Sequence, residues 1–205
     1  LWDHFLTSFM ATVDVRAGDR VLDVCAGTNA IGIALLQREP GLKVHAIDRS
    51  EAMQEVGQQR ARDRGLQIES TIGDVHELPF PDNHFDAVTL QYASRHLRIK
   101  NVFQEIHRVL KPGGRVYHCD MLRPANPAVE TLYYTYLRLC LSFTGFVFRS
   151  GPAALNCKDY FISALQMFYS AEELSAMLRE VGYREVEAKT LLAGTIGFHR
   201  GTKTS

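Results

Sequence analysis

The chain has 205 residues, of which 46% are hydrophobic, and its 23 basic and 23 acidic residues give a formal net charge of zero. This length and composition are typical of one globular domain with a full hydrophobic core. A neutral chain lacks the basic surface that holds nucleic acid, so we expect no nucleic-acid partner. The most apolar run, residues 137–148, is shorter than the about 20 residues that a helix needs to span a bilayer.

Four cysteines occur in the chain, and none of them is in CxxC spacing: Cys25, Cys119, Cys140 and Cys157. We therefore expect free thiols in a reducing compartment, and neither a metal site nor a redox pair. The first ten residues, LWDHFLTSFM, have no basic region followed by the apolar core of a signal peptide. Together these features predict a cytoplasmic protein.

Strand and helix patterns alternate over the first two thirds of the chain. β-rich runs occupy residues 20–26, 42–48, 66–73, 84–93 and 115–122, and helical patterns occupy residues 29–39, 50–64 and 99–110. Ser50 is placed to cap the second of these helices, and KPGG at 111–114 predicts a tight turn before the fifth strand. The alternation predicts an α/β fold, doubly wound, with helices on both faces of a mostly parallel sheet.

The pattern changes between residues 123 and 169, where Pro124 and Pro127 open an aromatic-rich stretch and Gly151-Pro152 interrupts it. We interpret this segment as an inserted helical lid. Its aromatic residues are candidates for lining the path of an apolar tail, with an ordinary core helix as the equal alternative: Tyr133, Tyr134, Tyr136, Phe143, Phe146 and Phe148.

The doubly wound pattern resumes after the lid. Ser170 and Glu173 form a capping-box pattern, and Gly182 ends the helix that follows. Two β-runs, 183–192 and 195–203, are separated only by Ala-Gly, so they must pair as an antiparallel hairpin.

The turn after the first strand, in VLDVCAGTNA, has the position of a nucleotide-binding loop. Gly27 allows the backbone to approach a ligand closely, and Asn29 is a plausible substitute for glycine because it tolerates the left-handed region. Asp48 ends the second strand 21 residues after Gly27, at the spacing of the acid that accepts ribose hydroxyls in nucleotide-binding sheets. A dinucleotide and S-adenosylmethionine both fit this pair.

Three features favour S-adenosylmethionine. The chain lacks the G-x-G-x-x-G fingerprint of dinucleotide sites. Asp23 lies in the first strand, where a ligand with an ammonium and a sulfonium is better matched than a dinucleotide. In GDVHELPFPDNHFD, Asp74 can accept from an adenine amine, with a surface turn as the alternative role, and the Val75 amide can donate to a ring nitrogen.

The segments VLDVCAGT, AIDRS, GDVHELPFPDNHFD and RVLKPGG resemble, in order and spacing, those of class I S-adenosylmethionine-dependent methyltransferases. Within that superfamily, LPFPDNHFDAVTL, SRHL, IHRVLKPGGRV and the ending LLAGTIGFHRGTK are most similar to the ubiquinone/menaquinone-biosynthesis C-methyltransferases of the UbiE type. The resemblance covers essentially the whole chain. It implies one methyltransferase domain over residues 1–205, with a Rossmann-like seven-stranded sheet, 123–169 as its lid and S-adenosylmethionine as cofactor.

By the same resemblance, the cofactor site comprises the first loop, the acid of AIDRS with its neighbour, and the ends of the third and fourth strands: Asp23, Gly27, Thr28, Asn29, Asp48, Arg49, Asp74, Val75 and Gln91. The chain departs from the family pattern at Asn29, where glycine is usual, and at His96, where the family has Asn. The acid and serine that follow the family's fifth strand correspond here to Asp120 and Leu122.

The chemistry implied by the resemblance is transfer of a methyl group to a ring carbon of a quinol. The acceptor reacts best as a phenolate, so a base or a cation must stabilise its oxygen. The candidates follow the fourth strand: Arg95 to hold the phenolate, His96 to take the proton, and Tyr92 beside them. The alternatives are that Arg95 pairs with Asp120 and that His96 begins the next helix.

The expected acceptor is a small molecule, a membrane-resident prenyl quinol that the protein reaches by transient contact with the inner membrane surface. A homodimer is left open. Three alternatives compete: a methyltransferase for another small-molecule acceptor, a non-catalytic cofactor-binding partner protein, and an NAD oxidoreductase.

Overall fold

A computed structural model describes residues 2–147, 160 and 162–204. The strands are β1 (Arg20–Val24), β2 (Lys43–Asp48), β3 (Glu69–Ile72), β4 (Phe85–Gln91), β5 (Leu110–Met121), β6 (Tyr183–Leu191) and β7 (Ile196–Lys203). The helices are α1 (Trp2–Met10), α2 (Ala30–Arg38), α3 (Glu51–Arg62), α4 (Ile99–Val109), α5 (Pro127–Val147) and α7 (Ala171–Val181), with 3₁₀ turns η1 (Ser94–His96) and η2 (Leu192–Gly194).

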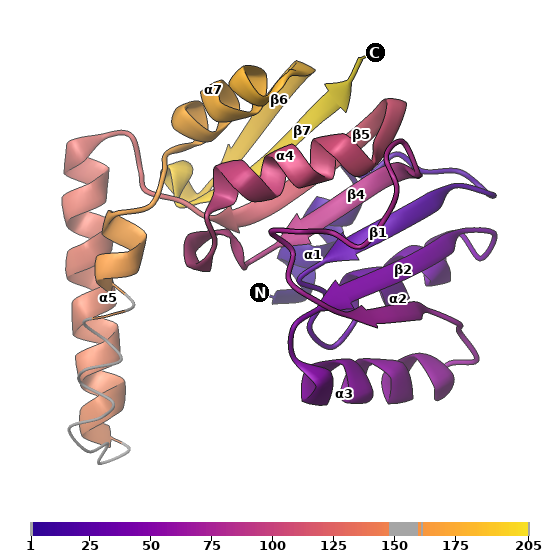
Figure 1. Ribbon diagram of the computed structural model, residues 1–205. Coiled ribbons are helices and arrows are strands. Elements are labelled where there is room, and N and C mark those ends of the chain that lie inside the picture. Colours follow the sequence, from indigo (N-terminus) through magenta and orange to yellow (C-terminus); the bar gives the residue numbers. More distant parts are fainter. Residues whose placement is uncertain (1, 148–159, 161, 205) are drawn as a thin grey trace.

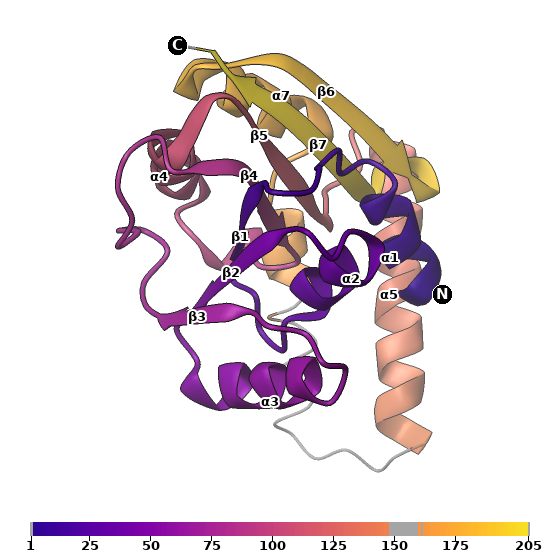
Figure 2. The same cartoon turned by 90° about the vertical axis from the view of Figure 1, so that its right-hand side faces the viewer.

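The strands form one seven-stranded sheet in the order β3-β2-β1-β4-β5-β7-β6 (Figures 1 and 2). Strands β1 to β5 pair in parallel, whereas β7 lies antiparallel between β5 and β6. The predicted doubly wound sheet with a C-terminal antiparallel hairpin is confirmed. The strand order reverses between β1 and β4, and ligands bind α/β sheets at the carboxyl ends of strands beside such a reversal.

Helices cover both faces of this sheet (Figure 2). On one face Phe103 of α4 and Leu174 and Leu178 of α7 join a core with the inward side chains of β1, β4 and β5. On the other face Phe9 of α1 and Leu35 of α2 pack against the opposite side chains of the same strands. Strands β1, β4 and β5 are thus buried on both sides, which explains their continuous apolar runs in the sequence.

Helix starts and stops follow the predicted caps. Ser50 accepts the Met53 N–H at the start of α3, and Ser170 forms a complete capping box with Glu173 at the start of α7. Gly182 ends α7 with a φ of 122°, a conformation that other residues rarely adopt.

The predicted turn at residues 111–114 forms inside β5 rather than before it. These residues lie between the Phe85–Leu110 and Ala87–Arg115 pairs, where the pairing of β5 with β4 shifts. Gly113 does have the expected positive φ, 80°. A Cβ on Gly114 would lie 2.8 Å from the Lys111 carbonyl oxygen, so the chain makes a bulge here rather than leaving the sheet.

Helix α5 extends away from the sheet along one side of the molecule (Figure 1). Tyr134 is buried against Ile162 and Leu165, and Tyr133 packs at the edge of this small cluster. Tyr136 and Phe143 lie on the exposed side of α5. The Gly151-Pro152 interruption, Phe148, Cys157 and the side chain of Phe146 lie outside the described residues.

Candidate active site

The loop between β1 and α2 turns sharply at the carboxyl edge of the sheet. Three of its residues have left-handed backbone conformations: Cys25 at φ 56°, Gly27 at φ 52° and Asn29 at φ 58°. The predicted role of Asn29 as a substitute for glycine is confirmed, because Asn is among the few residues that tolerate this region. The loop therefore makes three left-handed turns with a single glycine among those residues.

Helix α3 also holds the Asn29 side chain in place. The Gln54 Nε2 donates to the Asn29 Oδ1 at 3.0 Å and to the Gly27 carbonyl at 2.9 Å. A Cβ on Gly57 would lie 2.8 Å from the Asn29 side chain, so only glycine leaves room for it. Sequence reasoning missed Gln54 and Gly57. The available signal was a polar residue and a glycine on the inward side of an otherwise exposed helix.

Asp48 joins the two strand ends that form the predicted cofactor site. Its Oδ2 accepts the Gly27 N–H at 2.8 Å, and its Oδ1 accepts the Ser50 N–H at 2.9 Å. These bonds orient the carboxylate toward the loop and leave lone pairs on both oxygens. The structure therefore brings Gly27 and Asp48 together, as their spacing predicted.

A small cavity of about 40 Å³ lies beside Asp48. It is lined by Cys25, Asp48, Arg49, Gly73, Asp74, Val75, His76 and Leu97. Four of the predicted cofactor residues meet here, from the ends of β2 and β3. The volume is smaller than the 300–1,000 Å³ typical of ligand pockets, so a nucleoside can enter only if the surrounding side chains move.

His76 lines this cavity beside Asp74, and sequence reasoning missed it. Its backbone N–H and ring Nδ1 both bond to the Asp74 Oδ1, at 2.9 and 2.6 Å. These hydrogen bonds hold the pKa of Asp74 below its ordinary value. The carboxylate predicted to accept from adenine is thus already bonded by His76.

Three buried polar atoms near the first loop have no hydrogen-bond partner within bonding geometry among the described residues. They are the Asn29 Nδ2 in the loop itself, and the Asp23 Oδ2 and the Gln91 Nε2 on the neighbouring strands β1 and β4. The other Asp23 oxygen accepts from the Thr89 hydroxyl at 2.7 Å, and burial raises the pKa of Asp23 to about 7. A buried carboxylate oxygen on β1 and a buried amide N–H group on β4 suit an amino acid's ammonium and carboxylate, so the residues present fit S-adenosylmethionine.

Thr28 and Arg49 lie at the rim of the site. The Thr28 hydroxyl accepts from Arg60 Nη1 at 2.7 Å, and Arg49 is exposed.

The predicted catalytic residues follow β4, where Tyr92 has a strained φ of 53° and η1 begins two residues later. Arg95 Nη1 donates to the Asp120 Oδ1 at 3.0 Å, so the alternative pairing of these two residues is confirmed. Asp120 is fully buried, whereas the Arg95 side chain is 14% exposed and covers it. His96 is exposed and stacks on Tyr160, with ring centroids 6.5 Å apart.

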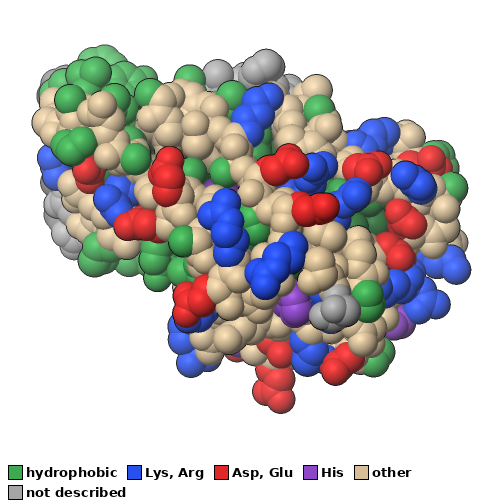
Figure 3. Space-filling model, turned by 90° about the horizontal axis from the view of Figure 1, so that it is seen from above, with side chains coloured by type: hydrophobic (Ala, Val, Ile, Leu, Met, Phe, Trp, Pro, Cys, Tyr) green, Lys and Arg blue, Asp and Glu red, His purple; other side chains and the backbone are tan. Residues whose placement is uncertain are grey.

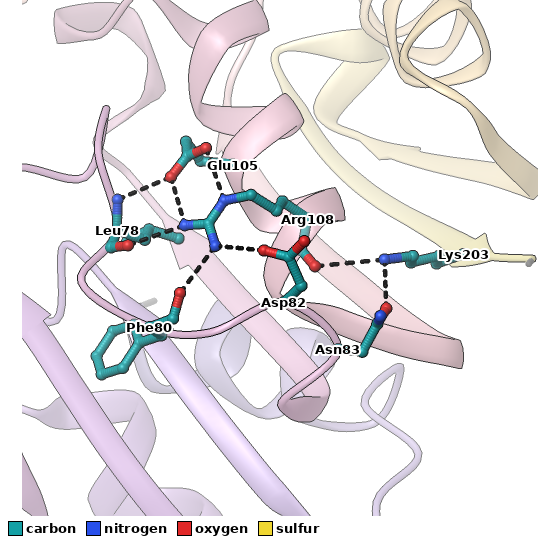
Figure 4. Close-up of polar contacts among 7 residues, drawn as sticks. All are labelled: Leu78, Phe80, Asp82, Asn83, Glu105, Arg108 and Lys203. Carbon is teal, nitrogen blue, oxygen red and sulfur yellow. Dashed lines mark hydrogen bonds and ion pairs between the residues drawn. The ribbon is translucent and has the colours of Figure 1, made fainter.

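The second half of GDVHELPFPDNHFD is structural (Figure 4). Arg108 of α4 donates to the carbonyl oxygens of Leu78 and Phe80 and pairs with Glu105 and Asp82. One guanidinium therefore pins the loop that follows Asp74 and Val75 against α4.

The fold and the strand-end site define a Rossmann-like, S-adenosylmethionine-dependent methyltransferase. A model of the ubiE/COQ5 methyltransferase family matches residues 1–203, and the chain belongs to this family. These findings confirm the expected enzyme class and cofactor.

Two relatives illustrate the similarity. The demethylmenaquinone methyltransferase of Symbiobacterium thermophilum is 33% identical, over 98% of this chain and 83% of the relative. The ubiquinone/menaquinone biosynthesis C-methyltransferase UbiE of Pseudomonas putida is 32% identical, over 99% and 78%. The fold also matches the Haemonchus contortus phosphoethanolamine N-methyltransferase 2, solved with S-adenosylhomocysteine, at a TM-score of 0.75 and 16% identity, over 100% of this chain and 53% of that one.

Proposed function

We propose that the chain transfers a methyl group to a ring carbon of a prenylated quinol. The observation that carries the acceptor assignment is the Arg95–Asp120 pair, a partly exposed cation set over a fully buried carboxylate at the end of β4. A cation at this edge suits a phenolate, the reactive form of a quinol. The names of the two relatives support a quinone-type acceptor.

The cofactor is proposed to lie across the ends of β1, β2, β3 and β4. Asp48 accepts from the ribose hydroxyls, Asp74 and the Val75 N–H meet the adenine, and Asp23 and Gln91 meet the amino-acid end. S-adenosylmethionine supplies an electrophilic methyl group when bound. The protein's task is to exclude water and to hold the acceptor carbon in line, for which alignment is worth up to about 7–11 kcal/mol.

Arg95 is proposed to hold the acceptor oxygen. Its guanidinium is positioned by Asp120, whose carboxylate also accepts the backbone N–H groups of Ser94 and Met121. Tyr92 packs against the core on the α1 and α2 face, and burial raises the pKa of its hydroxyl, which therefore stays protonated and donates to Cys119. His96 lies on the exposed side, where it contacts the acceptor's entrance rather than its reacting ring.

Residues 123–169 are proposed to form a lid over the acceptor. Arg95 lies close enough to Tyr133 of α5 for its positive charge to act on the pKa of the Tyr133 hydroxyl, which supports this placement. Leu132, Tyr136, Leu139 and Phe143 follow each other every three or four residues on the outer side of α5 and are 61–72% exposed. Figure 3 shows hydrophobic side chains gathered at the end of the molecule where α5 lies.

This outer ridge of α5 supports a second part of the proposal, transient contact with a membrane that holds the quinol. Among the described residues, no helix is both long and apolar enough to cross a bilayer. We expect the double variant Leu139→Ser, Phe143→Ser to float less with phosphatidylcholine vesicles than the wild type. Val56→Ser, an exposed apolar position on α3, is the matched control, and equal flotation of all three proteins contradicts membrane docking by α5.

The acceptor is tested by incubating the full chain with labelled S-adenosylmethionine and a demethylmenaquinol, with mass spectrometry of the product. We expect one methyl group on the quinone ring. Arg95→Gln should lower kcat by about 10²-fold or more, as for removal of one oxyanion-binding group. Arg98→Gln changes an exposed arginine three residues away and should leave kcat unchanged. Methylation at oxygen, or of other acceptors only, would contradict the proposal.

A further inference from the structure

Five polar residues form a continuous hydrogen-bonded line that begins in η1 and runs into the protein. We call it the buried polar row: Arg95, Asp120, Ser94, His118 and His199. Asp120 accepts from Arg95 at 3.0 Å and from the Ser94 N–H at 2.8 Å. The Ser94 hydroxyl lies 2.7 Å from the His118 Nε2, and the His118 Nδ1 lies 3.2 Å from the His199 Nδ1. Only Arg95 is partly exposed, so the row leads inward from the proposed acceptor site.

When both histidines are neutral, the contacts of this row allow one arrangement of protons. The His199 Nε2 lies 3.0 Å from the Ala171 carbonyl, which can only accept, so the Nε2 carries the proton and the Nδ1 of a neutral His199 does not. The His118 Nδ1 must then donate to His199, which leaves the His118 Nε2 without a proton. The Ser94 hydroxyl therefore donates to His118.

The row can take up one further proton without breaking any contact. If the His118 Nε2 becomes protonated, it donates to the Ser94 oxygen, and the Ser94 hydroxyl turns toward Asp120, with which it also hydrogen bonds. Every other bond keeps its direction. The row thus has one open proton position, and Asp120 lies at its outer end.

C-methylation of a quinol releases one proton, because a ring C–H becomes C–CH₃ while the sulfonium becomes a neutral thioether. We propose that Asp120, Ser94 and His118 form a relay that takes up this proton, with His118 as its final holder. The inference rests on the proposed function and names the proton acceptor for that reaction.

The proposed step conserves protons and charge. The O–H bond of an acceptor hydroxyl beside Arg95 breaks, and its proton passes to an Asp120 oxygen. Asp120 gives a proton to the Ser94 oxygen while the Ser94 hydroxyl gives its own to the His118 Nε2. The carboxylate is restored, the phenolate is paired with Arg95, and His118 has become an imidazolium. After the methyl group is transferred to the ring carbon, the C–H bond of that carbon breaks and its proton moves to the acceptor oxygen, which restores the aromatic hydroxyl. The proton returns outward by the reverse path after the product leaves.

The charged groups around His118 determine when it accepts the proton. Burial lowers the pKa values of His118 and His199, so both start neutral at pH 7. Phe103, whose ring meets His118 edge to face, and His199 carry no negative charge. Glu172 of α7 lies near His199 and favours its protonated form. Asp120 is the carboxylate that Ser94 connects to His118, and Arg95 offsets its charge until an acceptor anion pairs with that guanidinium instead. The freed carboxylate then favours an imidazolium at His118.

The proton arrangement is tested directly on the full chain by ¹⁵N NMR of the imidazole rings at pH 7.5. We expect His118 as the Nδ1–H tautomer and His199 as the Nε2–H tautomer. His118 in the Nε2–H form would overturn the relay, because its accepting position would already be filled.

The relay is tested separately by Ser94→Ala and His118→Gln. Each should lower kcat by about 10²-fold, the lower range for removal of a general base, while the KM for the demethylmenaquinol and the Kd for S-adenosylmethionine stay unchanged. His107→Gln is the matched control, because His107 is a half-buried histidine on α4 that contacts Tyr183 and not the row.

Two failures are distinguishable. A wild-type enzyme that methylates the quinol, with Ser94→Ala folded and unchanged in kcat, overturns the relay and leaves the proposed function standing. A wild-type enzyme without turnover on the quinol overturns the proposed function, and the relay with it. If His118→Gln does not fold, Ser94→Ala and the NMR tautomers decide the question.

Discussion

The Asp48 carboxylate accepts the Gly27 backbone N–H at 2.8 Å and thereby connects the end of β2 to the loop after β1. Its second oxygen is bonded to the Ser50 N–H, which opens α3. One side chain therefore orders three elements and faces the proposed ribose position. Loop geometry and ligand binding depend on the same carboxylate.

Asp48→Asn should weaken S-adenosylmethionine binding by about 10- to 100-fold, because hydrogen bonds to a charged group are worth about 1.5–3 kcal/mol. The amide keeps one acceptor oxygen but presents an N–H group to either Gly27 or Ser50. Isothermal titration calorimetry measures the change. Glu55→Gln, at an exposed acid on α3, is the control and should bind as the wild type does.

Cofactor affinity should rise with pH between about 6 and 8. Burial raises the pKa of Asp23 to about 7, so the free protein holds Asp23 partly protonated at neutral pH, whereas a bound ammonium favours the carboxylate. Binding below pH 7 therefore releases a proton. Calorimetry at pH 6 in two buffers with different ionisation enthalpies measures the released proton.

Asp23→Asn is the matched variant for this test. It should bind the cofactor more weakly and lose the pH dependence. The stability of the wild type should fall with pH while its cofactor affinity rises. Because the folded pKa of Asp23 lies above the unfolded value of about 3.9, ionising Asp23 lowers the stability of the wild type progressively from about pH 4 to pH 7. The variant should thus be more stable than the wild type at pH 8 by urea unfolding. A pH-dependent affinity in Asp23→Asn would assign the titration to another group.

Asn29→Ala should destabilise the protein more than Asn29→Gly. Both variants lose the hydrogen bond from Gln54, but only alanine retains a Cβ at a φ of 58°. The left-handed region costs a non-glycine residue about 1–2 kcal/mol, so the two variants should differ by about that amount in the free energy of unfolding. Urea denaturation measures it. Equal stabilities would show that the loop relaxes to another conformation.

Arg108→Lys should loosen the loop over residues 78–83. A lysine ammonium cannot reach the Leu78 and Phe80 carbonyls and both acids at once, as the planar guanidinium does. We expect a loss of about 2–3 kcal/mol in stability and faster hydrogen exchange of the loop amides. Lys100→Ala removes an exposed ion pair with Glu180 and should change stability by less than about 1 kcal/mol.

Local sequence patterns predicted a large share of this structure. The capping box at Ser170, the left-handed Asn29 and the spacing of Gly27 and Asp48 follow from short-range preferences or from the regular length of a strand–helix–strand unit. The position of the Pro-Gly-Gly turn was less predictable, because β5 begins at Leu110 and the turn forms as a bulge between the Phe85–Leu110 and Ala87–Arg115 pairs.

The amino-acid sequence by itself therefore determined the class of fold, the sharp loop after β1 and the acid that bonds to it. Only the tertiary structure decided which polar side chains meet: Asp120 with Arg95, His76 with Asp74, and His118 with a histidine 81 residues away. The last contact depends on the register of an antiparallel pair, where a slip of one residue would turn the side chain to the other face of the sheet. Such contacts between distant residues leave no periodic trace in the sequence.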